Sequence, residues 1–424
     1  MLETLKNAWK VKELRNKILF TLLIIVIFRI GSFIPVPYIN PDMIKAATTE
    51  NSFFSYLSIL TGGGLEYGAI FAMSITPYIN ASIIIQLLCV AIPYLERLSK
   101  EGEEGQKKLA TITRYTTVIL ALIQGVAYFF YLEASGCLSV TKGIWFAAIV
   151  IVLTFAAGSA VVMWLGEQID VKGIGNGISI LLFAGILSRG PNAFVALWSY
   201  FIDLKQYVAV IAIIIAFLAI IAFIVWMTHA ERRIPVQYAK RVVGNKMYGG
   251  QNTHIPIKVN MSGVMPVIFA SSILMLPTMV LSFMNTTQQA SSFGKFLALF
   301  STQGVFYAVI YFIMIIAFAY FYATIQFNPV EMANNLRKNG GAVPGIRPGK
   351  PTSDFISKIL SRITLMGALF LSIIAILPII IGNVGQINVS LGGTSVLIMV
   401  GVALDTVNNL ESQMMMRHYK GFLD

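Results

Sequence analysis

The sequence predicts an all-α membrane protein that crosses the bilayer about ten times. Of the 424 residues, 57% are hydrophobic and only 12% are charged, and the mean hydropathy is +0.76. Soluble domains carry a charged fraction of about 25%. The segment from Val208 to Met227 is apolar throughout, and its length is that of an α-helix crossing about 30 Å of hydrocarbon. Because lipid offers the backbone no hydrogen-bonding partner, such a segment must be helical.

Lysine and arginine residues predict how the chain is oriented in the membrane. The candidate spans are 18–36, 76–93, 112–131, 144–165, 174–190, 208–228, 262–283, 304–326, 360–381 and 393–410. If the N-terminus is cytoplasmic, 25 of the 31 Lys and Arg residues fall in cytoplasmic segments. The positive-inside rule then places both termini in the cytoplasm. For any single lysine among them, the alternative is that it only sets the orientation of the chain in the membrane and has no further function.

Two predicted cytoplasmic loops, about 229–260 and 328–360, are far longer than the roughly two to eight residues that usually connect bundle helices. The first has two strand-like runs on either side of Gly244-Asn245, which predicts a β-hairpin. The second contains GGAVPGIRPG, where glycine and proline favour defined turns. A flexible linker is the alternative, although such linkers seldom combine so many prolines with bulky and charged residues.

Residues 61–74, TGGGLEYGAIFAMS, are apolar but too short to span the membrane, and we predict a half-helix there that lies against protein or a water-filled cavity. In the helix that follows, Asn80, Ser82 and Gln86 add polar groups to the helix that carries Ile79 and Ile83. Polar side chains in a spanning helix indicate a protein interior or a water-lined path. Ordinary hydrogen bonds between helices are the alternative explanation.

Motifs for catalysis, cofactor binding and metal binding are missing from the sequence. The glycines of GEQIDVKGIGNGISILL follow no strand, so we read them as sites of close helix approach, with Asn176 opening a helix. Two distant cysteines and three scattered histidines offer no metal site. The spans hold few ionisable groups, chiefly Arg29 and Asp405, whereas ion-coupled transporters need such groups at mid-membrane. We therefore predict a protein without enzymatic activity, cofactor or metal.

Several long motifs, in the same order along the whole chain, are similar to one family. They are FRIGSFIPVP, ITPYINASIIIQLL, KEGEEGQKKL, MWLGEQIDVKGIGNGISI, ERRIPVQYAKR, THIPIKVNMSGVMPVIFASS, FNPVEMANNLRKNGGAVPGIRPG and GGTSVLIMV. The chain resembles the bacterial SecY family (SecY/SEC61-alpha). The resemblance implies two inverted, pseudo-symmetric halves arranged as a clamshell. Residues 1–205 would hold helices 1–5 and the plug at about 61–74, and residues 206–424 would hold helices 6–10 and both long loops.

The resemblance also implies a function. Members of the family form a channel that passes unfolded secretory polypeptides across the membrane and releases transmembrane helices into lipid through a lateral gate. A small-solute secondary transporter is the alternative, and it would be distinguished by a polar or charged constriction. The implied partners are the SecE and SecG subunits, the SecA motor ATPase, the ribosome with its rRNA and proteins, signal sequences, unfolded preproteins and membrane lipids. The implied location is the bacterial cell membrane, with a plastid membrane as the alternative.

Four groups of site residues follow from the resemblance. The pore ring would be Ile79, Ile83, Ile178, Leu182, Ile268 and Ile398, with Leu182 where many relatives have isoleucine. The plug would include Gly62, Gly63, Gly64, Leu65, Tyr67, Ile70 and Phe71. The lateral gate, helices 2 and 3 against helices 7 and 8, would carry Gln86 and Asn260 as a polar pair. The docking surface for SecA and the ribosome would use Arg241, Lys246, Arg347 and Lys350.

Overall fold

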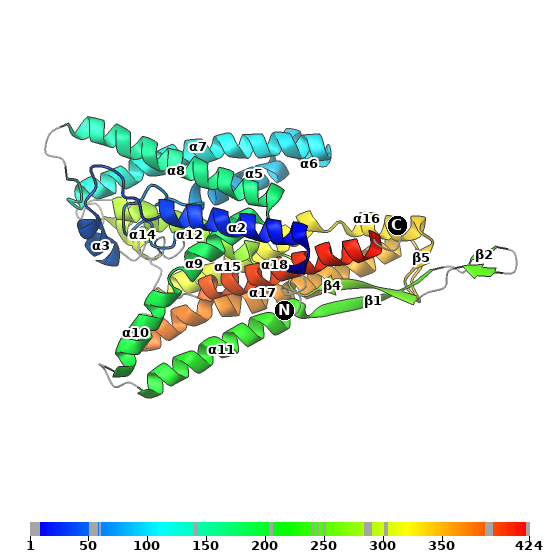
Figure 1. The fold of residues 1–424 in the computed structure, drawn as a ribbon. Coiled ribbons are helices and arrows are strands. Elements are labelled where there is room, and N and C mark those ends of the chain that lie inside the picture. The colour runs from blue at the N-terminus through cyan, green and yellow to red at the C-terminus, as the bar shows by residue number, and fades with distance from the viewer. Residues whose placement is uncertain are drawn as a thin grey trace.

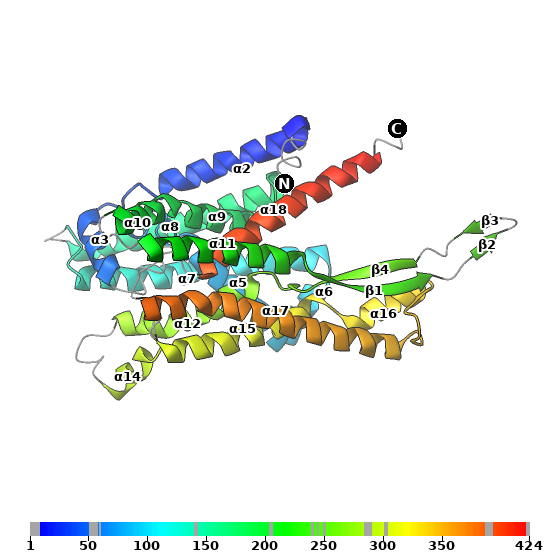
Figure 2. The same cartoon turned by 90° about the horizontal axis from the view of Figure 1, so that it is seen from below.

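Helices make up most of the chain and run along one long axis, with a β-sheet extending from one end (Figures 1 and 2). We call this the sheet end of the molecule. The structure, a computed structural model, describes residues 9–50, 58, 61–139, 143–202, 207–238, 241–243, 246–248, 252–283, 291–300, 304–385 and 393–420. The first long helix starts at the sheet end and the last long helix finishes there.

Each of the ten predicted spans overlaps a helix, although several bounds differ. These helices are α2 (Lys12–Gly31), α5 (Thr76–Ala91), α7 (Glu103–Ala134), α8 (Ile144–Lys172), α9 (Gly177–Leu187), α11 (Tyr207–His229), α12 (Met265–Phe283), α15 (Val305–Gln326), α17 (Lys350–Gly385) and α18 (Gly393–Lys420). Within the described residues, five helices are long and apolar enough to cross a membrane by themselves, and a bent pair makes a sixth. The protein is therefore a mostly helical membrane protein with several apolar spans.

Short helices fill several of the connections. They are α3 (Pro41–Glu50), α6 (Pro93–Lys100), α10 (Gly190–Ile202), α14 (Ser292–Ala298) and α16 (Pro329–Lys338). The bent pair is α5 and α6, whose axes differ by 103°. Ile92 between them is extended because it precedes Pro93, and the proline ring disfavours helical backbone in the residue before it.

Gly177, the first residue of α9, allows this helix to pack closely against α8, as the sequence predicts. Asn176 caps α9 by accepting a hydrogen bond at 3.0 Å from the backbone N–H of Ser179. A Cβ added at Gly177 would lie only 2.0 Å from the carbonyl oxygen of Gly166 on α8. This glycine therefore serves helix packing.

We expect Gly177→Ala to lower the free energy of unfolding by about 1–3 kcal/mol, because the backbone of α8 must shift to admit one methyl group. The measurement is thermal unfolding of the purified protein in detergent. Gly190→Ala is the matched control, since a Cβ there meets no atom within 4 Å. Equal melting temperatures for the two variants would contradict the close approach.

The first long loop forms the predicted hairpin and extends it. Strands β2 (Arg241–Val243) and β3 (Lys246–Tyr248) are antiparallel, with Val243 opposite Lys246. The predicted turn residues 244–245 lie outside the described residues. Below them, β1 (Glu231–Tyr238) pairs with β4 (Asn252–Lys258). On its other edge, β1 pairs with β5 (Gly341–Ala342) of the second loop, a connection that the sequence does not predict.

The second long loop is a packed structure, so the flexible-linker alternative is wrong. Val343 packs in one apolar cluster with Ile234 and Ile257 of the sheet and Ile356 of α17. The predicted loop also contains α16, and α17 begins at Lys350, about ten residues before the predicted span at 360. These helical turns were missed because they lie beyond the apolar stretch.

The half-helix predicted at 61–74 is wrong in its secondary structure: these residues form consecutive turns. Gly62, Gly63 and Gly68 have positive φ values of 67°, 88° and 56°, which are incompatible with a right-handed helix. Backbone bonds tie the turns to the chain after α2: Val36 N–H donates to Gly68 O, and Ile70 N–H donates to Ile34 O. We call residues 61–74 the turn segment.

Candidate functional site: an apolar constriction covered by a segment of turns

Apolar residues from several helices pack together in one cluster. Five of the six predicted pore-ring residues belong to it: Ile79 of α5, Ile178 and Leu182 of α9, Ile268 of α12, and Ile398 of α18. We call these five residues the constriction cluster. The sixth, Ile83, lies one turn after Ile79 and packs in a neighbouring cluster that Ile79 also contacts.

The constriction cluster consists of aliphatic side chains alone. Leu182 and Ile398 are only 6% and 4% exposed, and the other three residues are half-buried. Flexible apolar side chains can deform around unlike residues without holding any of them by hydrogen bonds or charge. A constriction of this kind suits a varied cargo and repels water and ions when it is empty.

The turn segment lies directly against the constriction cluster. Phe71 belongs to the same group of packed side chains, and its ring stacks on that of Phe28 at 6.1 Å between centroids. A Cβ at Gly158 of α8 would lie 2.1 Å from the carbonyl oxygen of Ile70, so only glycine permits this approach. Of the other predicted plug residues, Leu65 is buried and Tyr67 is exposed against Phe33.

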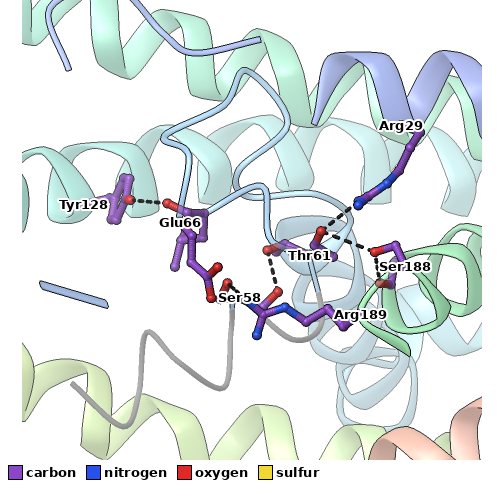
Figure 3. Close-up of polar contacts among 10 residues, drawn as sticks. Arg29, Ser58, Thr61, Glu66, Tyr128, Ser188 and Arg189 are labelled. Atoms are coloured by element: carbon purple, nitrogen blue, oxygen red, sulfur yellow. Dashed lines mark hydrogen bonds and ion pairs between the residues drawn. The ribbon is translucent and has the colours of Figure 1, made fainter. Parts of the chain in front are cut away.

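Polar side chains hold the backbone of the turn segment in place (Figure 3). Arg29 donates to the Gly62 carbonyl at 2.7 Å, and Ser188 donates to the same oxygen at 3.3 Å. The hydroxyl of Tyr128 donates to the Leu65 carbonyl at 3.3 Å. Of these donors, the sequence drew attention to Arg29 alone, as a rare cation in a span. The other two carried no signal, because a lone Ser or Tyr near a helix end is common.

The structure does not bring the two predicted gate residues together. Gln86 donates to Ser82 of its own helix at 3.3 Å. Asn260 lies five residues before α12, in a pocket lined also by Lys258 and Asp405. Its buried side-chain oxygen has no hydrogen-bond partner within the part of the chain that the structure describes. The helices predicted to form the gate do meet in part. Helix α12, the seventh predicted span, contacts both α5 and α7, the second and third.

The predicted docking residues gather at the sheet end. Arg241 and Lys246 lie on β2 and β3 at the tip that projects farthest from the bundle (Figure 2). Arg347 is exposed on the turn before α17, and Lys350 is exposed as the first residue of that helix. That turn is well defined, because the Thr352 hydroxyl donates to the Arg347 carbonyl at 2.9 Å.

Comparison with known proteins gives consistent matches. Residues 69–407 match the SecY family. The chain is 44% identical over 435 residues to the protein translocase subunit SecY of Bacillus licheniformis, with 100% of both chains covered. It is 41% identical over 432 residues to the same subunit of Thermotoga maritima, covering 100% of this chain and 98% of that one.

Solved structures agree on the fold. One described as a protein-conducting channel has a TM-score of 0.64 at 19% identity, covering 94% of this chain and 92% of its own. A second, of a SecY protein whose plug domain is described as stabilising the closed channel, has a TM-score of 0.66 at 20% identity and the same coverage.

The family match includes every residue of the constriction cluster, from Ile79 to Ile398. The small-solute transporter alternative required a polar or charged constriction, and the observed cluster is apolar. The chain therefore belongs to the SecY family, as a protein-conducting channel subunit of the protein translocase that catalyses no reaction itself.

Proposed function

We propose that the constriction cluster, together with Ile83, is the pore ring of this channel, and that the turn segment is its plug. The observation that carries the proposal is the single apolar cluster shared by the five ring residues and Phe71. An unfolded chain presents every kind of side chain. The ring must therefore deform around each of them without binding any of them specifically. It must also stay dry, since each elementary charge that crosses a potential of 100 mV releases about 2.3 kcal/mol.

A stalled secretory chain tests this proposal. We expect its residues to crosslink to cysteines placed at Ile83 and Ile268, one at a time, in the intact translocase. Ile313→Cys is the control, because Ile313 lies on α15 and is 59% exposed on the bundle surface. Equal crosslinking at Ile313 and Ile268 would contradict passage through the ring.

The lateral gate of our proposal is the seam where α12 meets α5 and α7. These helices belong to different proposed halves, 1–205 and 206–424, and the two halves also meet at α9 and α18. Contact at α9 and α18 supports a hinge on one side of the pore, with the seam able to part on the other. A signal sequence or a new transmembrane helix would leave for the lipid through that seam.

We expect Gln86→Leu and Asn260→Leu to have additive effects on the gate, because Gln86 donates to Ser82 of its own helix and the side-chain oxygen of Asn260 has no hydrogen-bond partner among the described residues. Additivity means agreement within about 0.3–0.5 kcal/mol for groups that share no partner. The measurement is export of a preprotein with a weakened signal sequence by each single variant and by the double variant. If the effect of the double variant differed from the sum of the single effects by more than this amount, the two residues would interact directly across the gate.

The orientation we propose puts the sheet end in the cytoplasm of a bacterial cell, together with both termini. The basic residues at 229–260 and 328–362 support it, because they fall at this end of the bundle (Figure 1). The turn segment then lies on the outer side of the constriction. The curated relatives named above are bacterial, which supports the cell membrane over a plastid membrane.

SecA and the ribosome would bind the sheet end. The packed apolar cluster beneath the sheet includes Val343 and Ile346 and gives the turn that carries Arg347 a rigid base, and basic residues such as Arg241, Lys246, Arg347 and Lys350 attract rRNA phosphates and acidic protein surfaces. Two structures with this fold support the ribosome as a partner. One is described as Sec61 in a canine ribosome-channel complex and the other as an idle yeast Ssh1 complex bound to the 80S ribosome.

The SecE and SecG subunits would cover apolar helix surface that this chain leaves open. Helix α11 has the highest hydropathy of the spans, yet only 11% of its most apolar stretch is buried within the chain. Lipid and small membrane subunits are the two environments that accept such a surface. We propose that SecE and SecG, together with lipid, cover exposed apolar helix surface of this kind.

A further inference from the structure

An ion pair joins the turn segment to the end of α9. Arg189, two residues beyond the last residue of that helix, pairs with the carboxylate of Glu66 and also donates to the hydroxyl of Ser58 at 3.2 Å. Figure 3 shows its guanidinium reaching between these two groups. The side chains of Arg189 and Glu66 are only 12% and 21% exposed, so water screens their attraction weakly.

The polar and the apolar contacts of the turn segment come from different parts of the channel. Arg29, Tyr128, Ser188 and Arg189 belong to α2, to α7 and to the end of α9, all in the proposed first half. The apolar cluster that contains Phe71 is shared between the halves, since it also includes residues of α12 and α18. Parting the halves therefore disturbs the apolar contacts and leaves the polar ones intact.

We propose that Arg189 is a positioning residue for the plug, which it fixes to the first half through Glu66. The proposal rests on the plug function proposed above for residues 61–74. In this arrangement, opening of the lateral gate and release of the plug are separate events, whereas a plug held by both halves would couple them. The lateral gate can open while the plug stays seated, and the plug leaves only when a translocating chain breaks the ion pair.

The local charges predict an order among substitutions. Glu66 is the carboxylate partner of Arg189, and the arginine is the less exposed of the two side chains, at 12% against 21%. Glu66→Gln leaves Arg189 mostly buried without its counter-ion, which is costly. Arg189→Gln leaves Glu66 without its counter-ion, but Glu66 is the more exposed of the two side chains and water reaches it more readily. The first substitution is therefore expected to release the plug more than the second.

The resting ion conductance of the purified channel complex in planar bilayers measures plug position. We expect Arg189→Gln to raise it on the order of tenfold, equivalent to about 1.4 kcal/mol, and Glu66→Gln to raise it further. Arg189→Lys should stay close to the unmodified channel, because an ammonium group can still pair with Glu66. The double variant Arg189→Glu with Glu66→Arg should restore most of the seal. Insertion of a transmembrane helix into lipid should be unchanged in all four.

Each other outcome overturns a stated part of the inference. Unchanged conductance in both glutamine variants would show that the ion pair does not position the plug. Leakage that neither the lysine variant nor the charge exchange reduces would reveal a general structural defect. A parallel change in helix insertion would show that plug and gate are coupled. Deletion of residues 62–71 is the reference: if that deletion leaks no more than the unmodified channel, the proposed plug function itself is wrong.

Discussion

Arg347→Glu is expected to abolish SecA-driven export while the channel complex still assembles. The side chain is exposed on the turn between Gly345 and Lys350, and the contact that orders this turn is made by its backbone carbonyl. Reversing its charge should therefore leave the fold unchanged. The introduced glutamate would repel the acidic groups that the basic residues of the docking surface attract. Like charges at an interface cost several kcal/mol.

The measurement for Arg347→Glu is ATP-dependent transport of a preprotein into inverted membrane vesicles, with the amount of assembled complex determined in the same vesicles. Lys295→Glu is the matched control, since Lys295 is also exposed but lies on α14, at the opposite end of the bundle. We expect that control to export normally. Normal export by Arg347→Glu as well would remove this residue from the docking surface.

Hydropathy predicted the spans well because lipid imposes one requirement, apolar length, that is local in sequence. The predicted span 208–228 differs from α11 by one residue at each end, and 304–326 differs from α15 by one. The error of about ten residues at the start of α17 has the same origin. A helix that continues beyond the membrane turns polar, so the hydropathy signal stops before the helix does.

Tertiary contacts explain what the sequence could not predict. The pairing of β1 with β5 joins residues about a hundred positions apart, and the two residues of β5 have no strand pattern of their own. The glycines at 62–64 allow either a hinge before a helix or a series of turns, and the sequence alone does not distinguish the two. Arg29, Ser188 and Tyr128 donate hydrogen bonds to backbone carbonyls of the turns. These donors lie in distant segments of the chain, so the local sequence does not reveal them.

The constriction residues are a different case. Polar groups near Ile79 and Ile83 pointed to an interior path, but an isoleucine in a spanning helix looks the same whether it faces lipid, a neighbouring helix or a pore. The resemblance to the SecY family supplied the six positions, and the structure brings five of them together in one cluster. Their roles in sealing the pore stay a prediction, and substitution within the cluster tests it.

Ile398→Asn is expected to make the resting channel conduct ions and to relax its requirement for a strong signal sequence. Ile398 is 4% exposed within the constriction cluster. Ser395 lies three residues earlier on α18, and within the described part of the chain its buried hydroxyl has no hydrogen-bond partner. An amide one turn away would give that hydroxyl a polar neighbour, and water could then bridge the two. A wet constriction loses its seal, since an apolar ring excludes ions by excluding water.

The closed state should lose stability by about 1–3 kcal/mol when an unsatisfied amide replaces the isoleucine side chain, and this loss biases the channel toward opening. Resting conductance in planar bilayers and export of a preprotein with a defective signal sequence measure the two consequences. Ile398→Leu is the control, because it keeps the volume and the apolar surface and should seal like the unmodified channel. If the asparagine variant sealed as tightly as the leucine variant, the barrier to ions would have to lie elsewhere, and the plug would be the first place to look. If both variants leaked, shape rather than polarity would be the property that α18 contributes to the ring.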